Sequence, residues 1–257
     1  MKYSIRSLII FSFSLLISVS LRGQDDAKEV FTRATDQMLT GNMEMVMEME
    51  SKDKKGRVKE KGYEILMASF GEVDKTKMTW QKPVQAKGTT VIFTERPGEV
   101  GLIEVYTPSN GKTRKIKASP ENKDMVGSEA MITNIAAQDP DGLAFMFLPP
   151  QELNGKNCYT LVVKDKEFKD QARGELLVEM DSYRIVQISV FDMYGKQTSL
   201  VKLSDYQATD GMRNKIQPRR IISEDLKNQK VTDIRVLKVA PRNNLSEEDF
   251  KLPVEGN

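Results

Sequence analysis

Four methionines are spaced for one kind of chemistry, adaptable apolar contact. In the stretch NMEMVMEMES, Met43, Met45, Met47 and Met49 alternate with residues that are mostly acidic. Because successive side chains of a strand point to opposite faces, this spacing predicts a strand with one thioether face and one mostly acidic face. Thioethers are flexible and polarizable, so such a face suits a cavity that accepts varied flexible chains. The same spacing fits an ordinary packed core, and the sequence leaves the two readings open.

The chain contains no histidine, which restricts the catalytic chemistry open to it. Without imidazole there is no Ser-His-Asp or Cys-His pair, no histidine-bound metal and no general base whose ordinary pKa lies near neutrality. The sequence also shows no glycine-rich phosphate loop and no clustered metal ligands. We therefore expect a protein that is not an enzyme and that needs no metal or cofactor. A hydrolase built without histidine is the enzymatic alternative.

A second candidate contact is the basic segment KTRKIK, with Lys112, Arg114, Lys115 and Lys117. Most charge runs are solvated faces, and that is the ordinary interpretation here. The functional alternative is a contact with anionic lipid headgroups or with an acidic partner at a membrane surface.

The first 23 residues predict a secretory signal peptide, because Lys2 and Arg6 precede an apolar run and small residues precede Gln24. A retained membrane anchor is the alternative. Cleavage would leave 36 basic and 37 acidic residues, a balance that does not attract nucleic acid. The sole cysteine, Cys158, is far from the cleavage region, so we expect neither N-terminal lipidation nor an internal disulfide.

The elements that must position these residues are mostly strands. An amphipathic helix over residues 25–41, capped by Asp25 or Asp26 and stopped at Gly41, is expected to precede the methionine strand. After it, strand-like segments alternate with short turns rich in Gly, Pro, Asn and Asp, which predicts an antiparallel sheet. The expected strands are 62–70, 75–82, 88–95, 101–108, 112–118, 158–165, 174–181, 183–192, 196–207, 213–225 and 230–240. We expect residues 24–257 to form one domain.

One region interrupts this rhythm. Residues 118–150 run from a polar loop through SEAMITNIAA into an apolar patch, and Ser128 is a plausible N-cap for a short helix. Such a helix could cover the open side of the sheet as a lid, or could simply pack beside it. The sequence does not separate these two interpretations.

The central block of the chain resembles the outer-membrane lipoprotein-sorting family of LolA-like periplasmic carriers. In that family a strand ends at a proline, a Gly-Thr pair opens the next strand, a Tyr-x-Pro turn leads into an Arg-x-Ile strand, and a Met-Gly-Ser motif precedes a short lid helix. The matching residues here are Pro83, Gly88-Thr89, Tyr106-Thr107-Pro108, Arg114-Lys115-Ile116 and Met125-Val126-Gly127-Ser128. The chain departs from the pattern at Glu104, where an aromatic residue is usual, and at Glu129-Ala130, where the family has an acidic-aromatic pair.

The resemblance implies a mainly β, α+β fold: a strongly curved antiparallel sheet forming an incomplete β-barrel, with an N-terminal helix and a short helical lid. It also implies a periplasmic carrier that shelters the acyl chains of lipoproteins or lipids and moves them toward the outer membrane. An inner-membrane donor and an outer-membrane acceptor would be its partners, with no nucleic acid, and we expect a monomer. Beside the four methionines, the candidate cavity-lining residues are Met67, Trp80, Phe93, Val105, Phe145 and Phe147.

Two other functions stay open at this point. The same half-barrel could act as a binding module that senses lipids or lipoproteins in envelope-stress regulation. It could also serve as a lipid shuttle for a membrane exporter, because acyl chains look alike to an apolar cavity.

Overall fold

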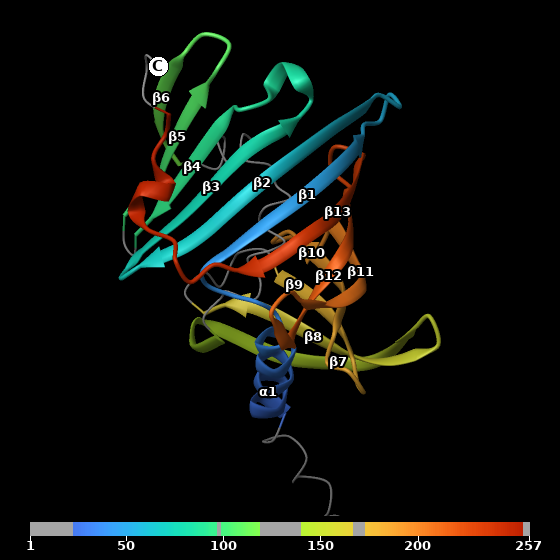
Figure 1. Ribbon diagram of the computed structural model, residues 1–257. Coiled ribbons are helices and arrows are strands. Elements are labelled where there is room, and N and C mark those ends of the chain that lie inside the picture. Colours follow the sequence, from blue (N-terminus) through green and yellow to red (C-terminus); the bar gives the residue numbers. More distant parts are fainter. Residues whose placement is uncertain (1–22, 97–98, 119–139, 167–172, 254–257) are drawn as a thin grey trace, which may run out of the picture.

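Alternating apolar and polar residues build a single antiparallel sheet of 13 strands in the computed structural model, which describes residues 23–96, 99–118, 140–166 and 173–253 (Figure 1). The strands of the N-terminal half are β1 (Met43–Lys52), β2 (Val58–Phe70), β3 (Val73–Lys82), β4 (Thr90–Glu95), β5 (Leu102–Thr107) and β6 (Lys112–Lys117). Those of the C-terminal half are β7 (Leu143–Leu153), β8 (Lys156–Asp165), β9 (Arg173–Glu179), β10 (Ile185–Phe191), β11 (Gln197–Thr209), β12 (Met212–Asp225) and β13 (Lys230–Pro241).

The strand order is β6-β5-β4-β3-β2-β1-β13-β12-β11-β10-β9-β8-β7. Each half is therefore a meander of hairpins, and the two halves are joined where the first strand pairs with the last. The sheet is not closed, since β6 and β7 are its two edges. It twists and curves so strongly that β7 and β8 run across the direction of β1, which gives the incomplete curved barrel that the sequence predicted (Figure 1).

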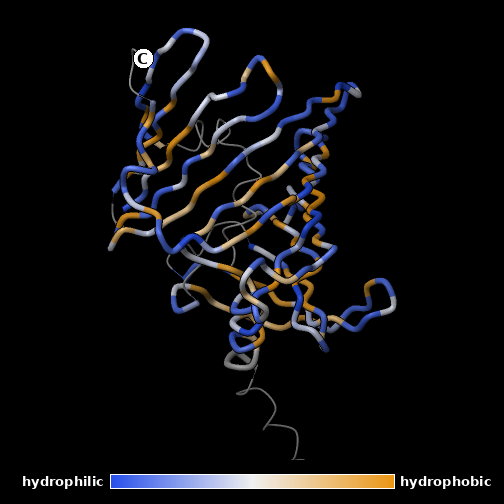
Figure 2. The backbone as a smooth tube through the Cα atoms, viewed as in Figure 1, coloured by the Kyte–Doolittle hydropathy of each residue, from blue (hydrophilic) through white to orange (hydrophobic). Residues whose placement is uncertain are grey.

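The alternation along each strand separates a concave from a convex face. Figure 2 shows hydrophobic and hydrophilic residues alternating along the strands. Residues directly opposite each other in neighbouring strands share a face, so the register carries one apolar face across the whole sheet. Most of the buried side chains gather in one cluster on this concave face.

The helix α1 (Gly23–Asp36) packs its apolar stripe into that cluster, next to β7. Phe31 is fully buried, and its ring centroid lies 5.0 Å from that of Phe145. The helix ends at Asp36, earlier than the predicted Gly41, because the backbone of Gln37 turns to the sheet: its carbonyl accepts the Ile216 amide at 2.7 Å. Within the described part of the chain, no helix is long and apolar enough to cross a membrane.

The convex face is covered locally by the C-terminal segment. A single helical turn, η4 (Glu247–Phe250), lies over β2 and β3, and Phe250 meets Phe70 edge to face at 5.6 Å. The Lys77 ammonium donates to the Asp249 and Lys251 carbonyls at 2.7 and 3.2 Å. These contacts fix the end of the chain outside the barrel, away from the concave face.

The strand β7 was not predicted from the sequence. β7 includes Pro149 and Pro150, which a central strand would not tolerate, but β7 is an edge strand, and its register to β8 shifts between Leu148 and Gln151. The other predicted strands are present with ends that differ by a few residues. The predicted helix after Ser128 lies outside the described residues.

Candidate functional site

The methionine row of β1 faces the concave interior, as its spacing predicted. Met43, Met45, Met47 and Met49 are each only 5–6% exposed and all belong to the central apolar cluster. The strand neighbours of the first three are apolar on both sides, as for Met45 between Ile65 of β2 and Val239 of β13, whereas Met49 has Lys61 on its β2 side. The intervening glutamates take the convex face, where they are half-buried or exposed.

The register places four further candidates on the same face. Met67 is opposite Met43, and Trp80 is opposite Tyr63, itself opposite Met47. Two more strands carry the face to the β6 edge, through the paired rows Met78–Val91–Val105 and Thr76–Phe93–Ile103. Phe145 and Phe147 join the central cluster from the other edge, on β7. All ten predicted lining residues therefore belong to one continuous apolar face.

These residues differ in exposure. The methionine row and Phe145 are buried, whereas the side chains on β2–β5 and Phe147 are half-buried, namely Met67, Trp80, Phe93, Val105 and Phe147. The helix α1 accounts for part of this contrast, because it packs against the β7 side of the sheet. On β2–β5 the face therefore combines these half-buried residues with buried ones such as Ile65, Met78 and Ile103.

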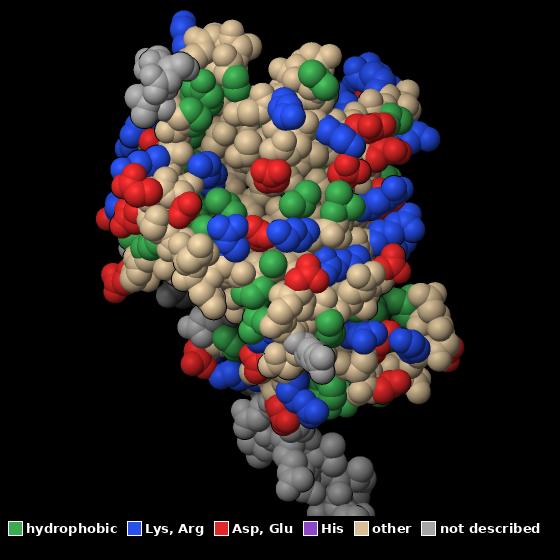
Figure 3. All heavy atoms as spheres, in the orientation of Figure 1, with side chains coloured by type: hydrophobic (Ala, Val, Ile, Leu, Met, Phe, Trp, Pro, Cys, Tyr) green, Lys and Arg blue, Asp and Glu red, His purple; other side chains and the backbone are tan. Residues whose placement is uncertain are grey.

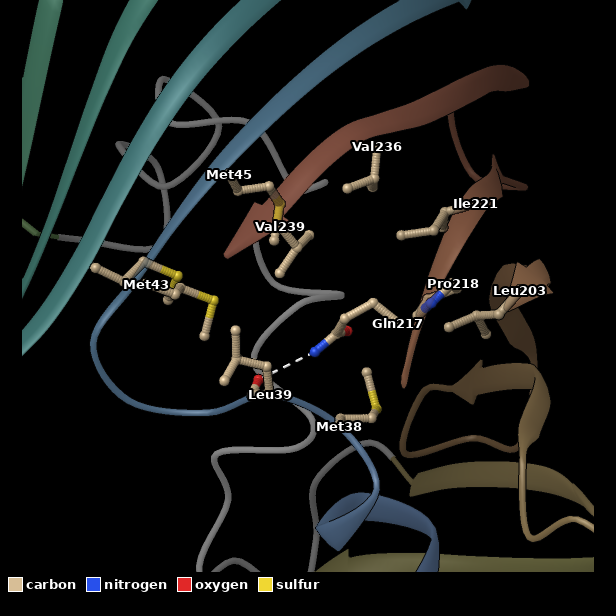
Figure 4. A pocket seen from close by; sticks show the side chains of 11 residues that line it. Met38, Leu39, Met43, Met45, Leu203, Gln217, Pro218, Ile221, Val236 and Val239 are labelled. Atoms are coloured by element: carbon tan, nitrogen blue, oxygen red, sulfur yellow. Dashed lines mark hydrogen bonds between the residues drawn. The ribbon is translucent and has the colours of Figure 1, made fainter. Parts of the chain in front are cut away.

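A small cavity remains where the α1–β1 connection meets the concave face (Figure 4). Its volume is about 20 Å³, which is room for about one water molecule. The lining is apolar apart from Gln217, whose amide is tied to the Leu39 carbonyl at 3.2 Å. The lining residues are Met38, Leu39, Met43, Met45, Met67, Leu203, Gln217, Pro218, Ile221, Val236 and Val239.

Only three of these eleven lining residues were predicted as such. Met38 and Leu39 were expected within the helix over residues 25–41, but they lie in the connection after α1. The lining residues of β11, β12 and β13 could have been found from the sequence, because apolar residues alternate along these strands and so predict which side chains face the core. What the sequence does not give is the pairing of β13 with β1, which brings Val236 and Val239 beside the methionines.

The glutamates between the methionines of β1 lie on the outer side of the site. The Glu44 carboxylate is ion-paired with Lys238 and Arg242 on the convex face, and hydrogen bonds from these two side chains hold its pKa below the ordinary value. Tyr206 is half-buried, its hydroxyl donates to the Ile185 carbonyl, and desolvation raises its pKa above the usual range. The interior therefore offers mainly apolar surface, and the polar groups of Gln217 and Tyr206 have hydrogen-bond partners there.

The basic strand β6 is divided between the two faces. Arg114 stands opposite Val105 and shares its face, whereas Lys115 is opposite Glu104 and ion-paired with it at 2.7 Å on the convex side. Lys112 shares the face of Arg114, and Lys117 that of Lys115. A flat partner could therefore meet only two of these four cations at once. The departure at Glu104 lies on the convex face, so it leaves the apolar face unaltered.

The Gly-Thr and Tyr-x-Pro motifs meet in space. Gly88 has a φ of +82°, and a Cβ placed on it would come within 3.2 Å of the Pro108 ring. Glycine is therefore needed both for the backbone conformation and for the close approach of the β3–β4 and β5–β6 connections.

Other kinds of site find little support among the described residues. No group of three or more Cys, Asp or Glu is placed to hold a metal ion there. Cys158 is fully buried, and burial raises the pKa of its thiol, which keeps it protonated.

Solved structures share this fold. A DUF1329 family protein from Desulfovibrio piger superposes with a TM-score of 0.73 at 16% identity, over 89% of this chain and 97% of that one. A domain assigned by name to outer membrane lipoprotein sorting, from Vibrio parahaemolyticus, gives 0.70 at 16% identity over 88% and 97%. A LolA superfamily protein from Nitrosomonas europaea gives 0.65 at 15% identity, again over 88% and 97%.

No curated protein matches the sequence of this chain. A family model described as "Uncharacterized protein" matches residues 72–253. The structural similarities confirm that the fold is the LolA-like half-barrel that the motifs around Gly88 and Pro108 indicated. Because the family model spans well over half of the chain, the protein belongs to the family that this model describes, and it shares its fold with the LolA-like proteins.

Proposed function

We propose that the protein is a periplasmic carrier that binds the acyl chains of lipoproteins or lipids against its concave face and moves them toward the outer membrane. The observation that carries this proposal is the continuous apolar face from β7 to β5, with four buried methionines at its centre. Residues 1–23 would be the signal peptide that directs the chain to the periplasm, and residues 24–257 the single carrier domain. No catalytic step belongs to this function.

The energetics favour such a surface. Each acyl methylene that leaves water gains about 0.8 kcal/mol, so a chain of about 15 methylenes gains about 12 kcal/mol. A carrier must replace membrane contact with apolar lining of similar extent. We expect the concave face to supply it, beginning at its half-buried residues Met67, Trp80 and Phe93.

The cavity itself is far too small for a lipid. Ligand pockets usually measure about 300–1,000 Å³, against about 20 Å³ here. Binding must therefore widen the interior, and methionine suits this task because its unbranched side chain has three rotatable bonds and repacks around varied shapes. The unpaired edges β6 and β7 leave the barrel free to widen without breaking strand pairs.

The chain carries a built-in reporter for this binding. Trp80 is the only tryptophan, it lies on the concave face, and its ring meets that of Tyr63 edge to face at 4.9 Å. A fatty acid brominated on its chain should quench Trp80 fluorescence when it occupies this face. The Trp80→Phe variant, loaded with the same lipid, should bind with similar affinity in a competition assay and show no tryptophan signal.

Cargo is identified by native mass spectrometry with lipid extraction, on protein purified from the periplasm without detergent. Co-purifying phospholipid or triacylated lipoprotein would support the carrier function and name its cargo. Protein that is empty, and whose Trp80 is not quenched by added brominated acyl chains, would contradict it.

A further inference from the structure

The rim at one end of the barrel includes the β5–β6 turn (residues 108–111), which has no charged residue, and beside it a continuous run of four hairpin connections. They are the β3–β4 connection (residues 83–89), the β1–β2 turn (53–57), the β12–β13 turn (226–229) and the β10–β11 turn (192–196). These hairpins follow one another in the sheet order from β4 to β10, so their turns lie side by side at the same end. With about 4.8 Å between strands, this run of four connections is about 34 Å long. We call it the hairpin rim; its β3–β4 and β1–β2 connections are visible along the top of Figure 1.

The hairpin rim gathers exposed apolar side chains. Nine large hydrophobic residues are exposed in the described part of the chain, and six of them lie in these turns or at the strand ends beside them. The most exposed are Tyr194 at 86% and Val84 at 82%. The six residues are Val58, Val84, Met193, Tyr194, Leu226 and Val231.

The same rim is basic. Its four connections contain six Lys or Arg residues and two Asp residues. Both aspartates are engaged within their own turns: Asp53 accepts the Lys55 and Arg57 amides, and Asp192 accepts those of Tyr194 and Lys196. Lys and Arg side chains surround the tip of the β1–β2 hairpin in Figure 3. The exposed lysines are Lys54, Lys55, Lys87, Lys196 and Lys227.

The opposite end of the barrel has the reverse charge balance. Its described connections lie at residues 71–72, 96 and 99–101, 154–155, 180–184 and 210–211. They contain four acidic and two basic residues, and one exposed large hydrophobic residue, Val100. The molecule therefore has one basic, apolar-tipped end and one acidic end.

We propose that the hairpin rim docks the protein on the surface of an anionic phospholipid bilayer. Tyr194, Val84 and Leu226 would enter the interfacial layer at three separate turns, and the lysines between them would meet the headgroups. A bilayer accepts separate insertion points at one level, whereas a protein interface needs a contiguous packed centre. The predominance of lysine points the same way, because protein interfaces are depleted in lysine and enriched in arginine.

Docking at this end has a geometric consequence for the interior. The methionine row of β1 runs from the cavity at Met43 and Met45 to Met49, four residues before the rim turn at Asp53. A lipid crossing the rim would meet this row first. The docking surface itself does not depend on the proposed carrier function, since it involves only exposed side chains.

The test is flotation of the processed protein with vesicles of phosphatidylethanolamine and phosphatidylglycerol, compared with vesicles of phosphatidylcholine alone. We expect binding to the anionic vesicles that weakens as salt is raised. Lys54→Glu should weaken it at least fivefold, and the matched reversal Arg96→Glu at the opposite end should not. Val84→Ser should also weaken binding, whereas Val100→Ser, at a position 67% exposed, should leave it unchanged.

These substitutions lie in exposed turns, so unchanged melting curves should accompany them. Equal binding to neutral and anionic vesicles, or equal effects of the rim variants and their controls, would overturn the proposal. Absence of vesicle binding at low salt would overturn it too, and binding of the rim to an acidic peptide instead would assign a protein partner. Quenching of Trp80 by brominated acyl chains without vesicles measures the interior separately, so failure of docking and failure of acyl binding are distinguishable.

Discussion

Truncating one methionine of the row, by Met45→Ala, tests whether the concave face is both a packed core and a binding surface. Met45 is 5% exposed, stands between Ile65 and Val239, and lines the cavity. Replacing a buried methionine by alanine costs about 2–5 kcal/mol, the upper end applying where the vacated space does not collapse. For a chain of this size we expect the melting temperature to fall by roughly 4–20 °C.

An acyl ligand that fills the enlarged cavity should recover part of this loss. A ligand that binds only the native state adds about 2.7 kcal/mol at a concentration 100 times its Kd. We therefore expect a long-chain fatty acid to raise the melting temperature of Met45→Ala by more than it raises that of the wild type. The assay is thermal unfolding followed by circular dichroism, with and without the ligand.

Met146→Ala is the matched control, because Met146 is 54% exposed on the outer face of β7. It makes the same chemical change away from the cavity, and its cost should lie within about 0.5 kcal/mol. If Met45→Ala costs no more than this control, the methionine row is not a packed core. If the fatty acid stabilises neither the wild type nor Met45→Ala, acyl chains do not bind at this cavity.

Two further predictions concern the convex face. The folded pKa of Glu44 is held below its ordinary 4.5 by hydrogen bonds from Lys238 and Arg242, so the stability from this cluster is present above pH 4.5 and is lost as pH falls through the folded pKa. Glu44→Gln should therefore lower the free energy of unfolding at pH 7. Urea titrations at several pH values should show that the variant loses less of this free energy on acidification than the wild type does. Identical pH profiles of the two proteins would refute this. Lys77→Met removes the donor that bonds the Asp249 carbonyl at 2.7 Å, at a cost of about 1 kcal/mol of stability. The substitution should speed amide hydrogen exchange in the C-terminal segment. Unchanged exchange would mean that the packing of Phe250 alone holds this segment in place.

The strands were predictable because one face of the sheet meets the core and the other meets water. In β1 the residues alternate between methionine and mostly charged partners, and this period of two overrode the helix propensity of Met and Glu. In β7 the same pattern was interrupted by Pro149 and Pro150, which are tolerated because β7 is an edge strand. The sequence does not show that this strand lies at an edge. Whether a strand lies at an edge depends on the order of all the strands in the sheet, and a local sequence pattern does not reveal that order.

The candidate site was predictable in part for the same reason. Parity along each strand follows from local sequence, so the shared face of Met67, Trp80 and Phe93 could be anticipated. The cavity could not, because it depends on β1 pairing with β13 across some 190 residues of chain and on the turn of the backbone at Gln37. Contacts between residues so far apart in the chain are set by the global topology, and no periodic pattern in the sequence predicts them.

The methionine row reconciles two properties that otherwise conflict in a carrier. Around the cavity of about 20 Å³ the methionines are buried and closely packed, which stabilises the unloaded barrel and keeps this part of its apolar face out of water. β-Branched side chains such as Val or Ile at Met43, Met45 and Met47 would also be buried, but their χ1 angles are stiff and would resist a widened state. Unbranched thioethers give up little packing when the barrel is empty and can adopt other rotamers when a chain enters. The choice of methionine at these positions therefore favours a surface that is remade on binding over a preformed pocket.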